Sequence, residues 1–294
     1  MWWCSCTWGP EDVTINQNAA IDLRARPASQ PRAIGTGHVA VRADANGVTR
    51  IADLRQSGSM KLVFPTVFRP AAETILVNTA GGITGGDKYA LTANVGQNAT
   101  LTLTTQAAER AYRAQPGEVG EVSTSLRVES GGRLNWLPQE LILFERCALR
   151  RRLDVTLAEG AELLMVEPVV FGRAAMHEEL RDVNFSDRIR IRRETDPLYI
   201  DGMDLRGDVA EHLTHAAIAD GAGAMVSLVL AAPDAANRLD KLRTMLPPTG
   251  AASLIREDVL VLRLLASDSF ELRRALVPIL DFLTQNTLPT SWRL

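Results

Sequence analysis

Apolar and polar residues alternate along much of the chain up to about residue 230, and the alternation itself repeats. In each repeat an alternating segment runs into a glycine-containing turn, and a second alternating segment then leads to Gln or Glu. Three copies can be superimposed, with the ranges 89–106, 122–140 and 153–167. Alternation with a period of two is typical of β-strands with one buried face. A repeat of roughly thirty residues therefore predicts stacked β-hairpins or solenoid-like rungs, each covering its neighbour's apolar face.

The hydrophobic period becomes helical towards the C-terminal end. Asp234 can cap a short helix that stops before Pro247, and Asp268 can cap a second one. Between them the apolar run 259–266 has the length of a buried strand. The predicted fold class is mainly β (α+β), with stacked β-sheets built from solenoid-like hairpin rungs and a few C-terminal helices.

We expect the chain to consist of two parts. Residues 1–33 contain a leader rich in Trp and Cys, which we expect to be poorly ordered, as termini without a docking partner often are. Residues 34–294 carry all the repeating patterns, and we expect them to form a single domain.

Charge and cysteine content exclude several functional classes. The chain has 32 Lys and Arg against 35 Asp and Glu, a net charge of −3, so no overall basic field holds nucleic acid. Three cysteines without framework spacing argue against a disulfide-stapled secreted domain. The sequence shows no export signal and no apolar stretch of membrane-spanning length. We expect a cytoplasmic protein that binds neither nucleic acid nor membrane.

Local basic segments remain within this weakly acidic chain. In residues 188–193 Arg alternates with Ile, which predicts a half-buried strand with a charged outer face. That face is either simply solvated or a docking surface for an acidic protein.

The glycine-rich run 78–87 is the most distinctive local motif. It is not a phosphate-binding P-loop, because Lys88 follows Asp87 and precedes Tyr89 instead of following Gly and preceding Ser or Thr. Its four glycines indicate a tight turn or bulge between strands. A turn without any ligand is the simpler interpretation.

Carboxylates recur beside the apolar segments, at Glu109, Glu140, Glu145, Glu167 and Glu178. Equivalent strand ends lie close together on stacked rungs, so these acids could line one edge or an internal channel. Carboxylates without imidazole or thiolate bind divalent ions weakly and exchangeably, which suits passing an ion along. The alternative is that each acid pairs with a nearby arginine at the surface.

Several segments together resemble the urease accessory protein UreD family. They are 78–87, 105–113 and 136–140, whose order and spacing also match, and further similarity lies in 172–176, 201–205 and 288–292. The resemblance runs from about residue 34 to the C-terminus.

The resemblance implies a β-rich, non-enzymatic chaperone in urease maturation. Proteins of this family bind the urease apoenzyme and recruit UreF, which docks the nickel-carrying GTPase UreG, and they are thought to conduct nickel through an internal passage. We accordingly expect UreF-like, UreG-like and urease structural subunits as partners. No cofactor is expected to bind tightly, and nickel is expected only in transit.

Site residues follow from the matching motifs. Asp87, Glu140 and Glu178 are the predicted walls of the nickel passage, because each lies in or beside such a motif. His177 stands where the family typically has glycine, so its imidazole could narrow a turn or add a ligand.

The C-terminal segment is the predicted contact with the UreF-like partner. Leu283, Leu288 and Trp292 are the apolar residues expected to contribute.

Two other classes compete with this interpretation. A β-solenoid carbohydrate-active enzyme would use clustered carboxylates, but only 5% of the residues are aromatic, which leaves few platforms for stacking sugars. A metal-storage protein would use His212, His215 and the Cys4 and Cys6 pair, yet the histidines have no third ligand at a fixed spacing.

Overall fold

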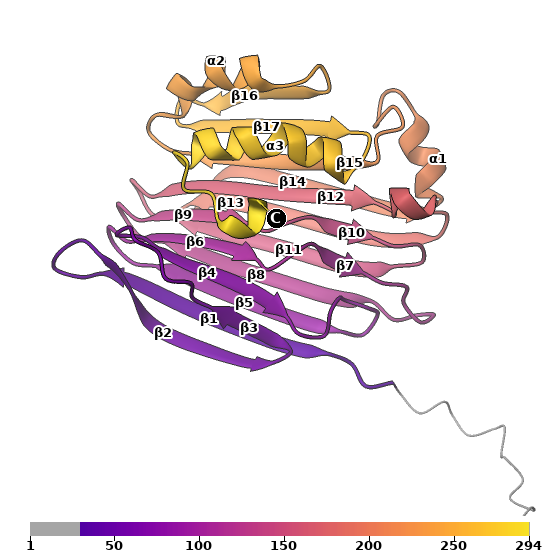
Figure 1. Cartoon of the computed structure of the whole chain (residues 1–294), viewed down its shortest axis with the longest axis horizontal. Helices are drawn as coiled ribbons and strands as arrows, with labels where there is room; N and C mark the ends of the chain where they lie inside the picture. Colours follow the sequence, from indigo (N-terminus) through magenta and orange to yellow (C-terminus); the bar gives the residue numbers. More distant parts are fainter. Residues whose placement is uncertain (1–29, 294) are drawn as a thin grey trace, which may run out of the picture. The chain divides into compact units, whose positions relative to one another are not determined.

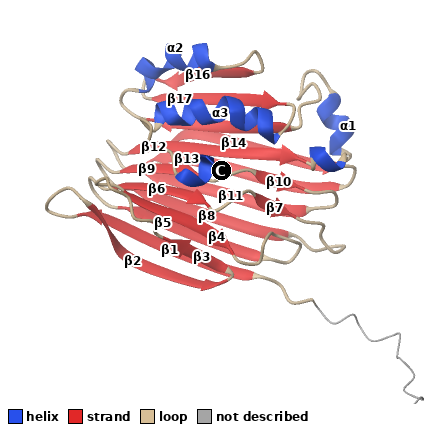
Figure 2. Cartoon of the chain, in the orientation of Figure 1, coloured by secondary structure: helices blue, strands red, loops and turns tan. Residues whose placement is uncertain are grey.

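A computed structural model describes residues 30–293. Two β-sheets face each other within residues 32–293, and helices cover the outer face of one of them (Figure 1). Sheet A has seven strands in the order β14-β13-β11-β8-β5-β1-β2. Sheet B has ten, with the main path β16-β17-β15-β12-β9-β6-β4-β3, and with β10 beside β12 and β7 beside β10. Strands dominate throughout, as Figure 2 shows, which confirms the mainly β fold class.

The strands of sheet A are β1 (Ile34–Ala43), β2 (Thr49–Gly58), β5 (Lys88–Val95), β8 (Gly120–Val128), β11 (Ala148–Leu157), β13 (Val183–Arg193) and β14 (Asp196–Gly207). Those of sheet B are β3 (Met60–Val63), β4 (Ala72–Asn78), β6 (Thr100–Thr105), β7 (Glu109–Ala111), β9 (Arg133–Leu137), β10 (Leu141–Leu143), β12 (Glu162–Phe171), β15 (Ala224–Ala231), β16 (Gly250–Arg256) and β17 (Val259–Ala266). The helices are α1 (Val209–Thr214), α2 (Ala235–Met245) and α3 (Ser269–Leu283), with short 3₁₀ segments η1 (Ala174–Met176) and η2 (Thr290–Arg293).

The three repeats seen in the sequence are three coils of a solenoid. Each coil places its first strand in sheet A and its second in sheet B, giving the pairs β5 and β6, β8 and β9, and β11 and β12. The two strands of one coil do not pair with each other as a hairpin would. They pair in parallel with the equivalent strands of the next coil, so Val95, Val128 and Leu157 stand in register. The turn must cross between sheets that pack about 10 Å apart, which a hairpin does not do.

Turn chemistry repeats with the coils. Asn98, Gly131 and Gly160 each follow the stacked residue by three positions, and each has a positive φ. Glycine adopts that conformation without a steric cost, and asparagine tolerates it better than most residues. The backbone amide of Gly131 also donates to the carbonyl of Gly160, so successive turns are hydrogen-bonded. The glycines of the repeat therefore serve the solenoid.

Two apolar layers hold the fold together. One lies between the sheets, and the other lies between sheet B and the helices α2 and α3. Strand β12 is buried on both faces, which explains why it is an almost continuous apolar run instead of an alternating one. Sheet A is covered on one face only, and its strands alternate in burial accordingly.

The C-terminal elements form where the sequence predicts them. Strand β17 spans the predicted run 259–266, and the side chain of Asp268 accepts a hydrogen bond from the backbone of Glu271 at the start of α3. Asp234 precedes α2 but makes no capping bond, because its carboxylate instead pairs with Arg238. No helix within residues 30–293 is both long and apolar enough to cross a bilayer. The predicted leader falls mainly on residues outside the described range.

Candidate functional site

Two cavities lie between the sheets and share one wall residue, Glu167. The larger, of about 530 Å³, extends towards β14, α1 and the β16–β17 edge. The smaller, of about 90 Å³, extends towards β4, β7 and the glycine-rich loop. Asp187 lines the larger cavity and Arg151 lines the smaller one. The side chains at this junction separate two hollow regions of one interior.

A buried ion cluster forms that junction. The guanidinium of Arg151 contacts Glu167 at 2.6 Å and Asp187 at 2.5 and 3.0 Å. The indole nitrogen of Trp136 donates to the other Glu167 oxygen at 2.6 Å. Within residues 30–293 no group meets hydrogen-bond geometry to Glu167 Oε2, and its 2.6 Å contact with Arg151 is an ion pair.

Strand register brings these groups together from distant parts of the sequence. In β11, Arg151 points inward while its neighbours Arg150 and Arg152 point outward. Asp187 stands opposite Arg151 in the neighbouring strand β13. Glu167 comes from β12 in the facing sheet, next to Ser227 of β15.

Burial and charge act on these groups in opposite directions. Burial raises the pKa of Glu167, and the Asp187 charge adds to the rise, while Arg151 opposes it. Burial tends to lower the pKa of Arg151, but the two carboxylates outweigh it and raise that pKa. The cluster has one cation for two carboxylates, so its ionisation depends on a single arginine.

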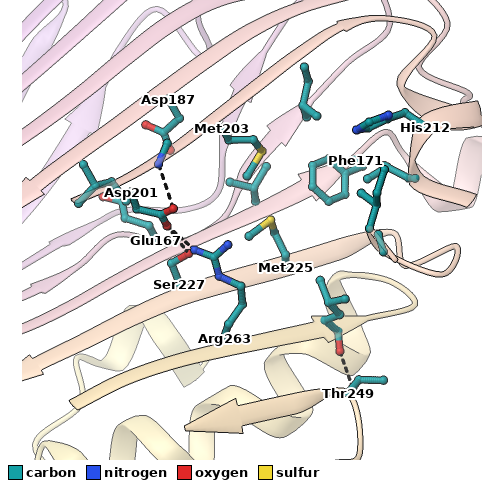
Figure 3. Close-up of a pocket in the computed structure, with 18 of the residues that line it drawn as sticks. Glu167, Phe171, Asp187, Asp201, Met203, His212, Met225, Ser227, Thr249 and Arg263 are labelled. Carbon is teal, nitrogen blue, oxygen red and sulfur yellow. Dashed lines mark hydrogen bonds and ion pairs between the residues drawn. The ribbon is translucent and has the colours of Figure 1, made fainter. Parts of the chain in front are cut away.

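The larger cavity changes character along its length. Its polar end holds Asp201, which accepts from Tyr199 at 2.8 Å and pairs with Arg263. Burial and the Asp201 charge raise the pKa of Tyr199 to about 12. Figure 3 shows Glu167, Asp187, Asp201, Ser227 and Arg263 towards one end, and Phe171, Met203, His212 and Met225 towards the other. Arg263 is exposed, so this cavity opens on the β17 side.

The smaller cavity is bounded by the glycine-rich loop. Asn78 begins this loop, and its side-chain amide donates to Glu109 at 3.1 Å and to the carbonyl of Gly82 at 2.9 Å. Burial raises the pKa of Glu109. A Cβ on Gly82 would approach the Tyr112 ring to 2.2 Å, so glycine is needed for the close approach. The loop joins β4 of sheet B to β5 of sheet A, and is therefore not a hairpin corner within one sheet.

Asp87, the first predicted passage residue, closes that loop. It is buried, and its carboxylate accepts from the backbone amides of Ala33 at 2.7 Å and Thr84 at 2.9 Å. It is absent from the walls of both interior cavities. These bonds assign Asp87 a structural role in shaping the loop.

Glu140, the second predicted passage residue, is connected to a predicted partner-binding residue. It accepts from Arg273 of α3 at 3.0 and 3.1 Å, and Arg273 also donates to the backbone carbonyl of Trp292 at 2.7 Å. The Trp292 indole donates to Leu137 at 3.0 Å. Leu283, Leu288 and Trp292 are all buried in the layer between sheet B and the helices. Their side chains therefore anchor the C-terminal segment, and a partner docking there would meet their exposed neighbours.

Glu178 and His177 lie after η1 and outside the two interior cavities. Arg173 donates to both Glu178 oxygens at 2.9 Å, and these hydrogen bonds lower the pKa of Glu178. Arg173 also stacks over Phe144, 4.4 Å from the ring centre. His177 is exposed with φ of 50°, a left-handed conformation that explains why glycine suits this position.

Sequence reasoning missed part of the interior cluster. Glu109 and Glu167 are among the recurring carboxylates, whereas the sequence patterns do not single out Arg151, Asp187 or Asp201. Asp187 offers one signal, since an acid at an inward position of an alternating strand is unusual.

Comparison with known proteins identifies the family. Residues 35–293 match the family described as UreD urease accessory protein. The chain belongs to the UreD family. The urease accessory protein UreD of Roseobacter denitrificans is 53% identical over 270 residues, covering 92% of this chain and 98% of that protein. UreD proteins of a Ruegeria species and Rhizobium rhizogenes are 52% and 43% identical, covering 90% of this chain and 91% and 96% of their own lengths. Membership of the UreD family supports a role in urease maturation and suggests a non-catalytic one.

Proposed function

We propose that this chain is a cytoplasmic maturation chaperone that binds the urease apoenzyme, associates with UreF-like and UreG-like GTPase partners, and gives nickel a route through its interior. It turns over no substrate and keeps no tightly bound cofactor. The family match supports the role in urease maturation. The observation that supports an interior route is that Glu167 borders both cavities.

Donor chemistry along the proposed route suits a borderline divalent cation. The smaller cavity offers the carboxylate of Glu109, and the larger offers Asp201, the thioethers of Met203 and Met225, and His212. Ni²⁺ accepts oxygen, sulfur and imidazole donors alike. Within residues 30–293 no group of three or more His, Cys, Asp or Glu is arranged to hold a metal ion. Donors spread in this way favour exchange over storage.

Arg151 keeps the junction acids from holding a cation tightly. Its guanidinium already neutralises much of the charge of Glu167 and Asp187, so an entering cation competes with it for the same oxygens. Glu167 is the acid that passes the ion between cavities, since it borders both of them. Weak binding here lets nickel leave as readily as it enters.

The residues predicted from the sequence motifs do not line the two cavities, and we assign them roles beside the proposed route. Asp87 shapes the loop beside the smaller cavity, and Glu140 holds the C-terminal segment through Arg273. Glu178 and His177 remain proposed contacts for nickel at the surface, where any cation would compete with Arg173 for Glu178. The C-terminal segment remains the proposed contact for the UreF-like partner, through residues other than its buried anchors.

Complementation tests this function. A urease operon lacking its own UreD gene is co-expressed with this chain or with an empty vector, and nickel per urease active site is measured with urease activity. We expect both to rise well above the empty-vector level. Nickel content no higher than in the empty vector, with the chain folded and expressed, would overturn the proposal.

Storage is separated from transit by equilibrium dialysis of the purified chain with Ni²⁺. We expect only weak binding. A submicromolar site that is lost on replacing both His212 and His215 would favour storage instead.

A further inference from the structure

The outer face of sheet A is strongly basic although the whole chain carries a net charge of −3. On its four central strands, β5, β8, β11 and β13, seven outward cations accompany two carboxylates. The cations are Lys88, Arg127, Arg150, Arg152, Arg188, Arg190 and Arg192, and the carboxylates are Glu121 and Asp154. We call this surface the arginine face.

Ion pairs compensate part of that charge. Asp154 is shared by Arg152 at 2.5 Å and Arg190 at 2.9 Å, and Glu121 pairs with Arg150 at 3.0 Å. Two acids outside these four strands also take part, since Asp204 of β14 pairs with Arg188, and Glu129 pairs with Arg127 at 3.1 Å. The seven cations therefore meet four carboxylates. The guanidinium of Arg192 donates to the hydroxyl of Thr156 at 2.9 Å. The arginine side chains stay open to solvent, at 64% exposure for Arg150 and 50% for Arg190. They are available to other anions.

The shape of the arginine face adds a second observation. A shallow hollow of about 370 Å³ lies on it, and its lining includes three cations and one acid, Lys88, Arg150, Arg152 and Glu121. Small side chains, Ala90 and Ser123, line the same hollow. Helices α2 and α3 pack on the other sheet, so within residues 30–293 no α-helix covers the arginine face. The arginine face is therefore a basic β-surface with a shallow hollow, and no α-helix of residues 30–293 covers it.

We propose that the arginine face docks an acidic surface of a protein partner. Six of its seven cations are arginines, whose planar guanidinium binds carboxylates in a bidentate manner. Glu121 and Asp154 stand among them and would repel a dense row of phosphates, but they fit a partner that carries mixed charge. None of the large apolar side chains exposed in residues 30–293 belongs to these four strands. Ile34 at the hollow and Ile200 opposite Arg190 are exposed at the borders of the arginine face, and two separated side chains make no continuous apolar face for a bilayer.

The first experiment looks for a partner among the urease assembly proteins, and to that extent rests on the proposed function. Tagged full-length chain is co-expressed with the urease structural subunits and accessory proteins of one operon, and each is quantified after affinity purification. We expect Arg188→Glu with Arg190→Glu to lower the recovery of one of these proteins at least about tenfold, as loss of a charge-paired interface does. The matched control, Lys241→Glu with Arg243→Glu, changes the same charge on α2 and should leave recovery unchanged.

A conservative variant guards against misfolding. Arg188→Ser with Arg190→Ser adds residues that already occur on the same face, and circular dichroism checks that the sheets form. We expect the same partner to be lost, with a smaller fold-change. Equal recovery of every protein with the face variants and the α2 control would overturn the proposal.

A second experiment does not depend on the proposed function. Purified chain is titrated with poly-L-glutamate, duplex DNA and phosphatidylserine vesicles at increasing salt. We expect poly-L-glutamate to bind, to weaken with salt, and to be lost in the Arg188→Ser and Arg190→Ser variant. Tighter, face-dependent binding of DNA or vesicles would contradict a protein partner. If no urease protein co-purifies with the unmodified chain, the proposed function fails while this experiment still reports on the arginine face.

Discussion

Arg151 on the inner face of sheet A is largely buried and paired, whereas the arginines on the outer face are exposed to solvent. Three consecutive arginines of β11 divide between the two faces: Arg151 is 15% exposed and held by two carboxylates, while Arg150 and Arg152 are 64% and 54% exposed. Exposed arginines require no fixed partner, whereas a buried one must be paired. Apolar residues would often fill such an interior at equal or better stability. Stability alone therefore does not explain why charged groups occupy this interior.

Removing the inner arginine should have the largest effect on folding. Arg151→Met leaves Glu167 and Asp187 buried without their cation, which should lower the free energy of unfolding by about 3–5 kcal/mol. The matched outer change, Arg152→Met, should cost no more than about 1 kcal/mol. Urea denaturation of both variants measures the difference.

Equal losses in the two variants would mean that burial does not set the cost. As a further control, Arg151→Met combined with Glu167→Gln and Asp187→Asn removes all three charges and should recover much of the stability.

A buried ion pair outside the cavities sharpens the comparison. Glu140→Gln weakens the contact that holds Arg273 and, through it, the carbonyl of Trp292, so we expect a loss of about 1–3 kcal/mol. Exposed Glu129, which pairs with Arg127, serves as the control in Glu129→Gln. Thermal unfolding and proteolysis of the C-terminal segment report the effect. If the Glu140→Gln variant is as stable as the unmodified chain but delivers less nickel to urease, the prediction that Glu140 lines the nickel passage would be favoured instead.

A buried thiol in the interior should make the free energy of unfolding depend on pH. Burial raises the pKa of the Cys147 thiol to about 12, from 9.0. Between these pKa values the folded state keeps the thiol proton and the unfolded state releases it. The contribution of Cys147 to the free energy of unfolding is therefore complete below about pH 9 and is lost as pH rises towards 12. At pH 10 the loss should be about 1.4 kcal/mol. Denaturation of the unmodified chain and Cys147→Ala at pH 8 and pH 10 isolates it, and identical pH slopes would refute it.

The smallest effect is expected on the outer face. Arg188→Ser with Arg190→Ser removes solvent-exposed ion pairs and the hydrogen bonds from Arg188 to the carbonyls of Asp187 and Met203. It should change the free energy of unfolding by less than about 1 kcal/mol. Urea denaturation measures it. A loss as large as that of Arg151→Met would mean that the arginine face is needed for folding and not for docking.

Much of the fold follows from local pattern. The three-coil repeat, the strand at 259–266 and the Asp268 cap depend on residues close in sequence, and each is present in the structure. Pairing is not local, and the alternation fits hairpins and solenoid coils equally well. Only the long-range register shows that β5 pairs with β8 and not with β6.

The interior site was harder to predict for the same reason. Arg151, Glu167 and Asp187 come from three strands in two sheets, and nothing in their local sequence links them. The family motifs directed attention to Asp87, Glu140 and Glu178, which bind backbone amides or arginines of this chain. A sequence motif does not tell whether a residue supports the fold or contacts a transported ion. The structure separates the two, because a buried acid that lines a cavity can meet an ion there.

The most direct test of the account is the nickel content of urease matured with Glu167→Gln. This change keeps the shape of the side chain and its acceptor for Trp136, and removes the charge at the point where the two cavities meet. We predict normal folding and normal recovery of partners, with nickel per active site reduced several-fold relative to Glu129→Gln. Unchanged nickel content in a folded, assembled Glu167→Gln complex would contradict the interior route.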